Sequence, residues 1–218
     1  MEVRPYRDED RSAVERVHFE TGFLGSSMDA LLSDAHLWDA KIAWYLDHEP
    51  ESALVLDSGS EVVGYLVGCL DDVKMGETRP ARVLTSLVSD AFASIRLPAQ
   101  DRRFWTSRFG WLGDILIGRS GERDLKMPPN AGHLHINLLP EARGQGYGSE
   151  LLRAFEAYAQ ERGVTTLHAE SFTTPLNPNT TFWERNGYSV YSEVPTTYWK
   201  LFVTEGMGIA SYRKDLDR

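Results

Sequence analysis

Three glycines within five residues constrain this chain more than any other feature of its sequence. Gly144, Gly146 and Gly148 follow an apolar run at 133–139 that is typical of a strand. An amphipathic helical segment comes next and ends at Gly163. Glycine lets the backbone turn sharply and approach a ligand closely, and the first turn of a helix offers unpaired N–H groups. The sequence therefore predicts a strand–loop–helix unit with a binding site for a phosphate group.

This loop does not match two widespread phosphate-binding loops. A P-loop ends in Gly-Lys-Ser/Thr, which is absent from 143–148. The glycine spacing is G-x-G-x-G, whereas a dinucleotide-binding loop has G-x-G-x-x-G. The alternative is a tight strand-to-helix turn, but such a turn does not require three glycines in five residues. We therefore expect a ligand-binding loop of another class.

Hydrophobic periodicity predicts an α/β fold for the rest of the chain. Besides 133–139, the expected strands are at 2–6, 53–56, 62–70, 164–171, 187–193, somewhere within 196–203, and 208–213. The expected helices are at 8–20, at 27–46 as one or two helices, and at 80–97, 101–118, 149–162 and 180–185.

Charge and cysteine content exclude several classes of protein. The 218 residues carry a formal charge of −9, which argues against a protein whose main role is to bind nucleic acid. Cys69 is the one cysteine, so neither an intrachain disulfide nor a thiolate metal cluster can form, and we expect no metal. No apolar signal core opens the sequence, and no apolar run approaches the roughly 20 residues of a membrane span. We expect a cytoplasmic protein that binds no membrane.

The charge is distributed unevenly. Residues 1–72 hold 5 basic and 16 acidic side chains, whereas residues 73–130 hold 10 and 6. An acidic first third could attract a cationic ligand, although solubility explains it almost as well. Three arginines of the middle section, Arg102, Arg103 and Arg108, could grip an anion, although a solvated helix face is the simpler interpretation.

The glycine loop and the segments around it resemble the GNAT superfamily of N-acetyltransferases. Arg143-x-x-Gly146-x-Gly148 matches that family's R/Q-x-x-G-x-G/A signature. The segment FWERNGY at 182–188 is similar to its F-Y-x-x-x-G-F segment. The run HLHINLLP at 133–140 resembles one branch of the family, which includes the acetyltransferase-like domain attached to some O-linked N-acetylglucosaminidases.

The resemblance implies a fold and a cofactor. The fold would be a mixed, mostly antiparallel sheet flanked by helices, in a single domain over 1–218 with a helical insertion at 73–130 between strands 3 and 4. The cofactor would be acetyl-CoA as acyl donor, without a metal. The resemblance assigns it Ile136, Asn137 and Leu138 along the pantetheine arm, Arg143, Gly144, Gln145, Gly146, Tyr147, Gly148 and Ser149 around the pyrophosphate, and Asn177 and Phe182 on the far side of the arm.

Two departures from the family pattern concern the acid side of the chemistry. The family often places a tyrosine where Trp183 stands, as the acid that protonates the leaving thiolate. An indole N–H donates a hydrogen bond but does not give up its proton. The family's asparagine falls at the position of Leu176, so that Asn177 is shifted by one residue. These departures bear on the chemistry and leave cofactor binding unaffected.

The candidate catalytic residues are two histidines and a glutamate. His133 and His135 lie two apart on a strand, so they share one face, and a neutral imidazole is a good general base near pH 7. The aralkylamine-acetylating branch of the family carries a similar His-x-His pair on this strand. Glu170 on the adjacent strand is a further candidate, whereas His168 is expected to be structural. Alternatively, one histidine of the pair is buried and hydrogen-bonded while the other borders the site.

The resemblance implies an acetyl-CoA-dependent N-acetyltransferase that acts on a primary amine. We expect a small acceptor, because a helical insertion near the acceptor side favours a partly enclosed site. The acidic first third leaves open a cationic acceptor. The alternatives are a non-catalytic acyl-CoA-binding module, or an acetyltransferase that modifies a protein lysine or N-terminus. No nucleic acid or membrane partner is expected, and a homodimer remains open.

Overall fold

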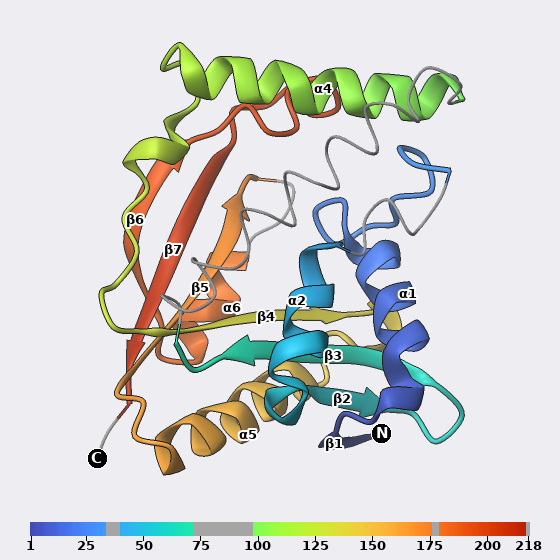
Figure 1. Ribbon diagram of the computed structural model, residues 1–218, viewed down its shortest axis with the longest axis vertical. Helices are drawn as coiled ribbons and strands as arrows, with labels where there is room; N and C mark the ends of the chain where they lie inside the picture. The colour runs from blue at the N-terminus through green and yellow to red at the C-terminus, as the bar shows by residue number, and fades with distance from the viewer. Residues whose placement is uncertain (34–39, 72–97, 176–178, 217–218) are drawn as a thin grey trace.

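A seven-stranded sheet runs through the protein (Figure 1). The computed structural model describes residues 1–33, 40–71, 98–175 and 179–216. The strands are β1 (Glu2–Pro5), β2 (Leu54–Asp57), β3 (Val62–Cys69), β4 (Gly132–Leu138), β5 (Thr166–Thr173), β6 (Ser189–Pro195) and β7 (Gly208–Asp215). Their order in the sheet is β1-β2-β3-β4-β5-β7-β6. Neighbouring strands are antiparallel except β4 and β5, which are parallel.

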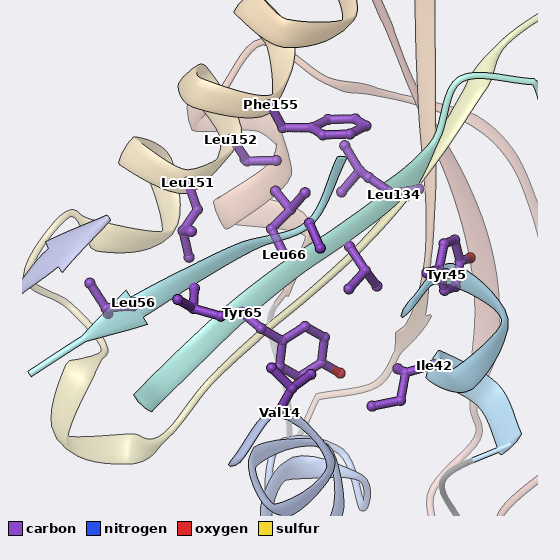
Figure 2. Packing of buried hydrophobic residues seen from close by; sticks show 14 of the residues in the cluster. Val14, Ile42, Tyr45, Leu56, Tyr65, Leu66, Leu134, Leu151, Leu152 and Phe155 are labelled. Atoms are coloured by element: carbon purple, nitrogen blue, oxygen red, sulfur yellow. The ribbon is translucent and has the colours of Figure 1, made fainter. Parts of the chain in front are cut away.

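Helices cover both faces of this sheet. The helices of the described residues are α1 (Arg11–Thr21), α2 (Ala40–His48), α4 (Ala99–Leu116), α5 (Tyr147–Glu161) and α6 (Asn179–Arg185), of which α4 lies across one end of the sheet (Figure 1). α1 and α2 pack against β3, and α5 packs against β2 and β3 from the other side. Figure 2 shows both layers, with Val14 and Tyr45 on one side of the strands and Leu151 and Phe155 on the other.

β3 is buried along its whole length because both of its faces are covered. All 8 of its residues are buried, and successive side chains enter opposite halves of the core. Such a strand has a continuous apolar sequence rather than an alternating one, as the run at 62–70 does. On α5, Leu151, Leu152 and Phe155 are fully buried against it. Each contributes about 2 kcal/mol of burial free energy.

The predicted architecture is confirmed. The mostly antiparallel sheet has helices on both faces, and α4 lies between β3 and β4 in the chain, close to the predicted helix at 101–118. α5 and α6 also form near the predicted positions. The other predicted helix of the insertion, 80–97, lies outside the described residues. The single domain with an insertion at 73–130 stays a prediction.

The strand expected within 196–203 is wrong. These residues form turns, in which the N–H groups of Phe202 and Val203 both donate to the carbonyl of Trp199. The neighbouring side chains Tyr198 and Trp199 are both buried. A strand would send adjacent side chains to opposite faces, whereas this turn lets both enter the same apolar cluster.

The segment 27–46, expected to form one or two helices, is an α-helix only in its second half among the described residues. Among its described residues, 40–46 belong to α2, and the N–H groups of Leu31 and Leu32 close a single turn on the carbonyl of Met28. Because all three of these side chains are buried, their helical spacing reflects one turn that packs into a core. The spacing alone does not distinguish such a turn from a longer helix.

A second apolar cluster, the distal cluster, lies between α4 and the β6–β7 connection. Its buried members are Phe19, Met28, Leu31, Leu32, Phe104, Trp105, Tyr198, Trp199, Val203 and Met207. Arg108 of α4 is only 5% exposed, so its expected place on a solvated face is wrong. The carbon of its guanidinium lies 3.5 Å from the ring centroid of Tyr198 and 4.2 Å from that of Trp199. Burial lowers the pKa of Arg108.

Candidate functional site

β4 and β5 separate after a short paired stretch. Their parallel pairing joins 132–134 to 167–169. β4 continues beside β3 as far as Leu138. Within the described residues, the other edge of β4 therefore has no strand partner beyond Leu134.

The direction of the backbone groups at this edge follows from the pairing with β3. The N–H of Leu139 donates to the carbonyl of Val63 at 2.8 Å. Backbone groups alternate in direction along an antiparallel strand, so those of Asn137 also face β3, whereas those of Ile136 and Leu138 face the separated edge. An extended ligand that contains amide groups can pair with this edge as an added strand would. Asn137, assigned to the pantetheine by resemblance, can offer its side chain but not its backbone.

Two glycines in the left-handed region shape the loop after β4. Gly144 has φ 73° and Gly146 has φ 91°. A residue with a side chain adopts this conformation at a cost of about 1–2 kcal/mol. A Cβ at either position would meet no atom within 4 Å, so the space in front of the loop is open.

The backbone amides of this loop form a candidate anion-binding site. Arg143 N–H donates to Pro140 and Ser149 N–H donates to Gly146, so these two predicted contacts to the pyrophosphate are used within the loop. For the amides of 144–148 no acceptor is found in the described part of the chain. Gly146 is the N-cap of α5 and brings no capping side chain. The N-terminus of α5, with roughly half a positive charge, therefore faces this space, and among its first N–H groups those of Tyr147 and Gly148 have no acceptor in the described residues.

The third glycine of the loop is needed for packing. A Cβ at Gly148 would lie 3.0 Å from Cε2 of Phe182 and 3.6 Å from Cδ1 of Leu138. Leu138 of β4, Gly148 of α5 and Phe182 of α6, all predicted to bind the cofactor, thus lie close together. Asn177, also predicted to bind it, lies outside the described residues.

The side chain of Arg143, the arginine of the loop motif, bonds to two backbone carbonyls of the protein. Nε of Arg143 donates to the carbonyl of Leu138 at 2.8 Å, and Nη2 donates to that of Gly25 at 2.7 Å. Burial lowers its pKa. The side chain therefore ties the end of β4 to the turn after α1. Gln145 likewise donates to a loop carbonyl, that of Glu141, and Tyr147 packs against the main core.

His135 lies on the face of β4 that α1 covers. It is half-buried, and its ring centroid is 5.5 Å from that of His18 on α1. Nδ1 of His18 is 2.7 Å from the hydroxyl of Tyr65, to which Nδ2 of Asn137 also donates at 3.2 Å. Burial raises the pKa of Tyr65, which keeps this hydroxyl protonated. His135 therefore borders a polar network buried among apolar side chains.

His133 belongs to a neighbouring group on the same face. It is buried, and its Nδ1 lies 2.6 Å from the hydroxyl of Tyr45 on α2. Its ring centroid is 4.7 Å from that of His168, also buried. One ligand atom from each of His133, His168 and Glu170 lies within 4.8 Å of the others. The structure thus brings the candidates His133 and Glu170 together and places His135 beside a separate network.

The position of the family's usual tyrosine is buried. Trp183 is 5% exposed, and its ring stacks on that of Tyr212 with centroids 5.6 Å apart. Its Nε1 is buried and has no hydrogen-bond partner among the described residues. The nearby Tyr188 is buried, and both burial and Glu156 raise its pKa. Trp183 therefore brings packing rather than a proton to this position.

Many carboxylates of the first third pair with arginines of the same segment. The ion pairs join Arg4 to Asp10 and Asp57, Arg11 to Glu15 and Asp47, and Arg16 to Glu20 and Glu61. These ion pairs neutralise part of the negative charge locally, so the electrostatic attraction of a cation is weaker than the number of acidic residues suggests. The attraction of a cationic acceptor therefore stays a prediction.

The sequence did not predict the residues that contact the candidate histidines from other elements. Tyr45, Tyr65 and His18 hold the two candidate histidines or their neighbours, and each reads in the sequence as an ordinary position of a strand or helix. Tyr45 and His133 are 88 residues apart in the sequence, so no local sequence pattern predicts their hydrogen bond.

Comparison with known proteins agrees with this geometry. The sequence profile of the acetyltransferase (GNAT) family matches residues 22–188. The crystal structure of SsHAT is similar, with 28% identity over 100% of this chain and 98% of that one, and a TM-score of 0.68.

Two more distant structures share the fold. One is yncA from Salmonella typhimurium with its cofactor acetyl-CoA, at 13% identity over 100% of this chain and 95% of that one, with a TM-score of 0.55. The other is Naa20 from Chaetomium thermophilum in complex with a bisubstrate analogue, at 17% identity over 99% and 87%, with a TM-score of 0.53. In the described part of this chain, no helix is both long and apolar enough to cross a membrane.

Proposed function

The chain belongs to the GNAT acetyltransferase family, and from this premise we propose that it transfers an acetyl group from acetyl-CoA to a primary amine of a small molecule. The observation that carries the proposal is the open edge of β4, which lies in line with an amide-lined glycine loop. Acetyl-CoA would supply an activated acyl group, the thioester, together with an amide-containing arm and a pyrophosphate. The arm would meet the open edge of β4, and the pyrophosphate would meet the amides of the glycine loop.

The loop would hold the pyrophosphate through its backbone. The amides of 144–148, which include the first two residues of α5, offer donors without using any basic side chain. Arg143 is engaged with two carbonyls, so its role would be to fix the loop's position. This arrangement explains how a chain with a formal charge of −9 can hold an anionic ligand.

The edge of β4 would position the thioester. Ile136 directs both its N–H and its carbonyl to the open edge, where an amide of the pantetheine arm could pair with them. Phe182, held against Gly148, would close the other side. The thioester would then lie near the point where β4 and β5 separate. Fixing a reactant in this way removes much of the entropic barrier to its reaction.

His135 is the group that we propose accepts the amine's proton. It is half-buried, whereas His133 is 6% exposed and held by Tyr45. A half-buried imidazole can pass its proton on to water, and histidine is the side chain whose chemistry suits a general base near pH 7. Because Trp183 cannot act as an acid, the leaving thiolate would take its proton from water or leave unprotonated.

The distal cluster supports a small acceptor rather than a protein chain. The ring centroid of Phe23, just after α1, lies 5.0 Å from that of Trp199 in the β6–β7 connection. Phe172 near the end of β5 lies 5.1 Å from Tyr198 of the same connection. These contacts hold the β6–β7 connection against the turn after α1 and against β5, where an extended peptide acceptor would have to displace it.

A thiol-release assay with acetyl-CoA tests the proposal. The acceptors are polyamines, aminoglycosides, arylamines and short peptides that contain lysine, each at matched concentration. Release of CoA with a small amine, together with the mass of its acetylated product, supports the proposed activity. Release with peptides alone would show instead that the acceptor is a protein.

One observation favours a second function, that of a non-catalytic acyl-CoA-binding module. Trp183 fills the position of the family's usual acid and is buried in the core. Calorimetry separates the two functions. Tight binding of acetyl-CoA without thiol release for any amine would identify the protein as a non-catalytic acyl-CoA-binding module. Absence of binding would exclude both the enzyme and the module.

A further inference from the structure

We propose that His133, His168 and Glu170 form a binding site for a divalent transition-metal ion, with Zn²⁺ as the preferred ion. The carrying observation is that one ligand atom from each residue lies within 4.8 Å of the other two. The inference does not depend on acetyl transfer, and its test does not measure that activity.

The parallel pairing of two strands places these side chains together. His133 of β4 lies directly opposite His168 of β5 in the short paired stretch. Glu170 is two residues further along β5, so its side chain is on the same face as that of His168. The three groups therefore converge because of the backbone register, without any contribution from a mobile loop.

The donor set and its spacing suit zinc. Imidazole nitrogen and carboxylate oxygen bind Zn²⁺ at about 2.0–2.2 Å, which places tetrahedral ligands about 3.3 Å apart. Starting from at most 4.8 Å, each ligand atom needs to move inward by about 0.9 Å or less, which is within the reach of a side-chain rotation. Three protein ligands leave one coordination position for water.

Tyr45 provides the support that a ligating histidine needs. Its hydroxyl lies 2.6 Å from Nδ1 of His133, so an ion at this site would be bound through Nε2 of that ring. Metal-ligating histidines almost always make such a bond through their other nitrogen, which fixes the tautomer and the ring orientation. Tyr45 is itself 2% exposed and packed between α2 and the sheet, so this support is rigid.

The burial of the group also fits a bound ion. His133 is 6% exposed and His168 is 1% exposed, whereas Glu170 is exposed. The imidazoles would form the inner side of the site and the carboxylate its solvent side, through which the ion would enter. A carboxylate also offsets part of the ion's charge in these apolar surroundings.

Titration of the untagged full-length protein with Co²⁺ tests the site, because Co²⁺ in a tetrahedral nitrogen and oxygen environment has visible d–d absorption bands. The protein is first dialysed against a chelator. The expected result is one Co²⁺ per chain with intense visible bands that Zn²⁺ abolishes by displacement. Absence of these bands, or their persistence after Zn²⁺ is added in excess, would overturn the proposal.

Two variants locate the ion. Glu170→Gln changes an exposed ligand and should retain the fold, which circular dichroism checks, while weakening Co²⁺ binding at least about tenfold. His48→Gln is the matched control, because His48 is exposed and stacks on Trp44 outside the group. Unchanged binding by Glu170→Gln, or equal loss in His48→Gln, would show that the ion binds elsewhere.

Discussion

A tryptophan placed at either end of α5 separates a defect in ligand binding from a defect in folding. Gly146 precedes the helix with φ 91°, and Gly163 follows it with φ 80°. A Cβ at either position meets no atom within 4 Å. The substitutions Gly146→Trp and Gly163→Trp therefore impose the same backbone strain and the same bulk, but only the first projects into the space before the helix N-terminus.

The expected magnitudes follow from this comparison. Each variant should lose about 1–2 kcal/mol of stability from the left-handed backbone. That loss lowers Tm by about 2–4 °C for each kcal/mol in a protein of this size. At Gly146 the indole also displaces the pyrophosphate from the loop amides. Losing two charge-assisted hydrogen bonds, at about 1.5–3 kcal/mol each, weakens Kd by roughly 10²- to 10⁴-fold.

Isothermal titration calorimetry with CoA is the appropriate assay, since CoA has the same phosphates as acetyl-CoA and does not react. Differential scanning fluorimetry gives the stability of each variant. We expect normal CoA affinity for Gly163→Trp and severe loss for Gly146→Trp at similar Tm. Normal affinity of Gly146→Trp, or an equal loss in both variants, would refute the assignment of the loop.

Three further predictions concern a proton acceptor, an ion pair and a buried charge. His135→Gln should remove the rise of kcat/KM with pH that a histidine general base produces between about pH 5 and 8, and an unchanged pH–rate profile would exclude this base. The hydrogen bond from Arg4 lowers the pKa of Asp10 in the folded protein, so stability is present above the unfolded carboxyl pKa of about 3.9 and lost as the pH falls below it. Asp10→Asn should therefore cost about 2 kcal/mol in urea unfolding at pH 7 and progressively less toward pH 3, whereas a pH-independent cost would contradict the linkage. Arg108→Met removes cation–π contacts together with a desolvated charge, so urea unfolding should show a change within about 1 kcal/mol, and a loss above about 3 kcal/mol would contradict this balance.

The parts of the fold that the sequence predicted are those with local causes. Gly144 and Gly146 adopt the left-handed conformations that only glycine tolerates well, so their spacing identified the loop before α5. The apolar run of β3 likewise follows from the burial of both its faces. The backbone part of the candidate site was therefore accessible to sequence reasoning.

The parts that the sequence did not predict depend on distant partners. The apolar spacing at 196–203 suggested a strand, but Trp199 and Tyr198 turn together into the distal cluster. Arg108 has the sequence context of a solvated helix face, yet aromatic rings from the β6–β7 connection bury it. Tyr45 reaches His133 only because α2 packs across the sheet. Such contacts are set by packing between elements, which a local pattern does not encode.

A crystal structure of the protein with acetyl-CoA tests most directly whether β4 and the glycine loop form the acyl-donor site. We predict that the pyrophosphate lies against the amides of 144–148. We also predict that an amide of the pantetheine arm pairs with the backbone of Ile136, with the thioester near the point where β4 and β5 separate. An acetyl-CoA molecule bound away from the loop, or a pantetheine arm that makes no contact with the backbone of Ile136 or Leu138, would contradict this placement of the site.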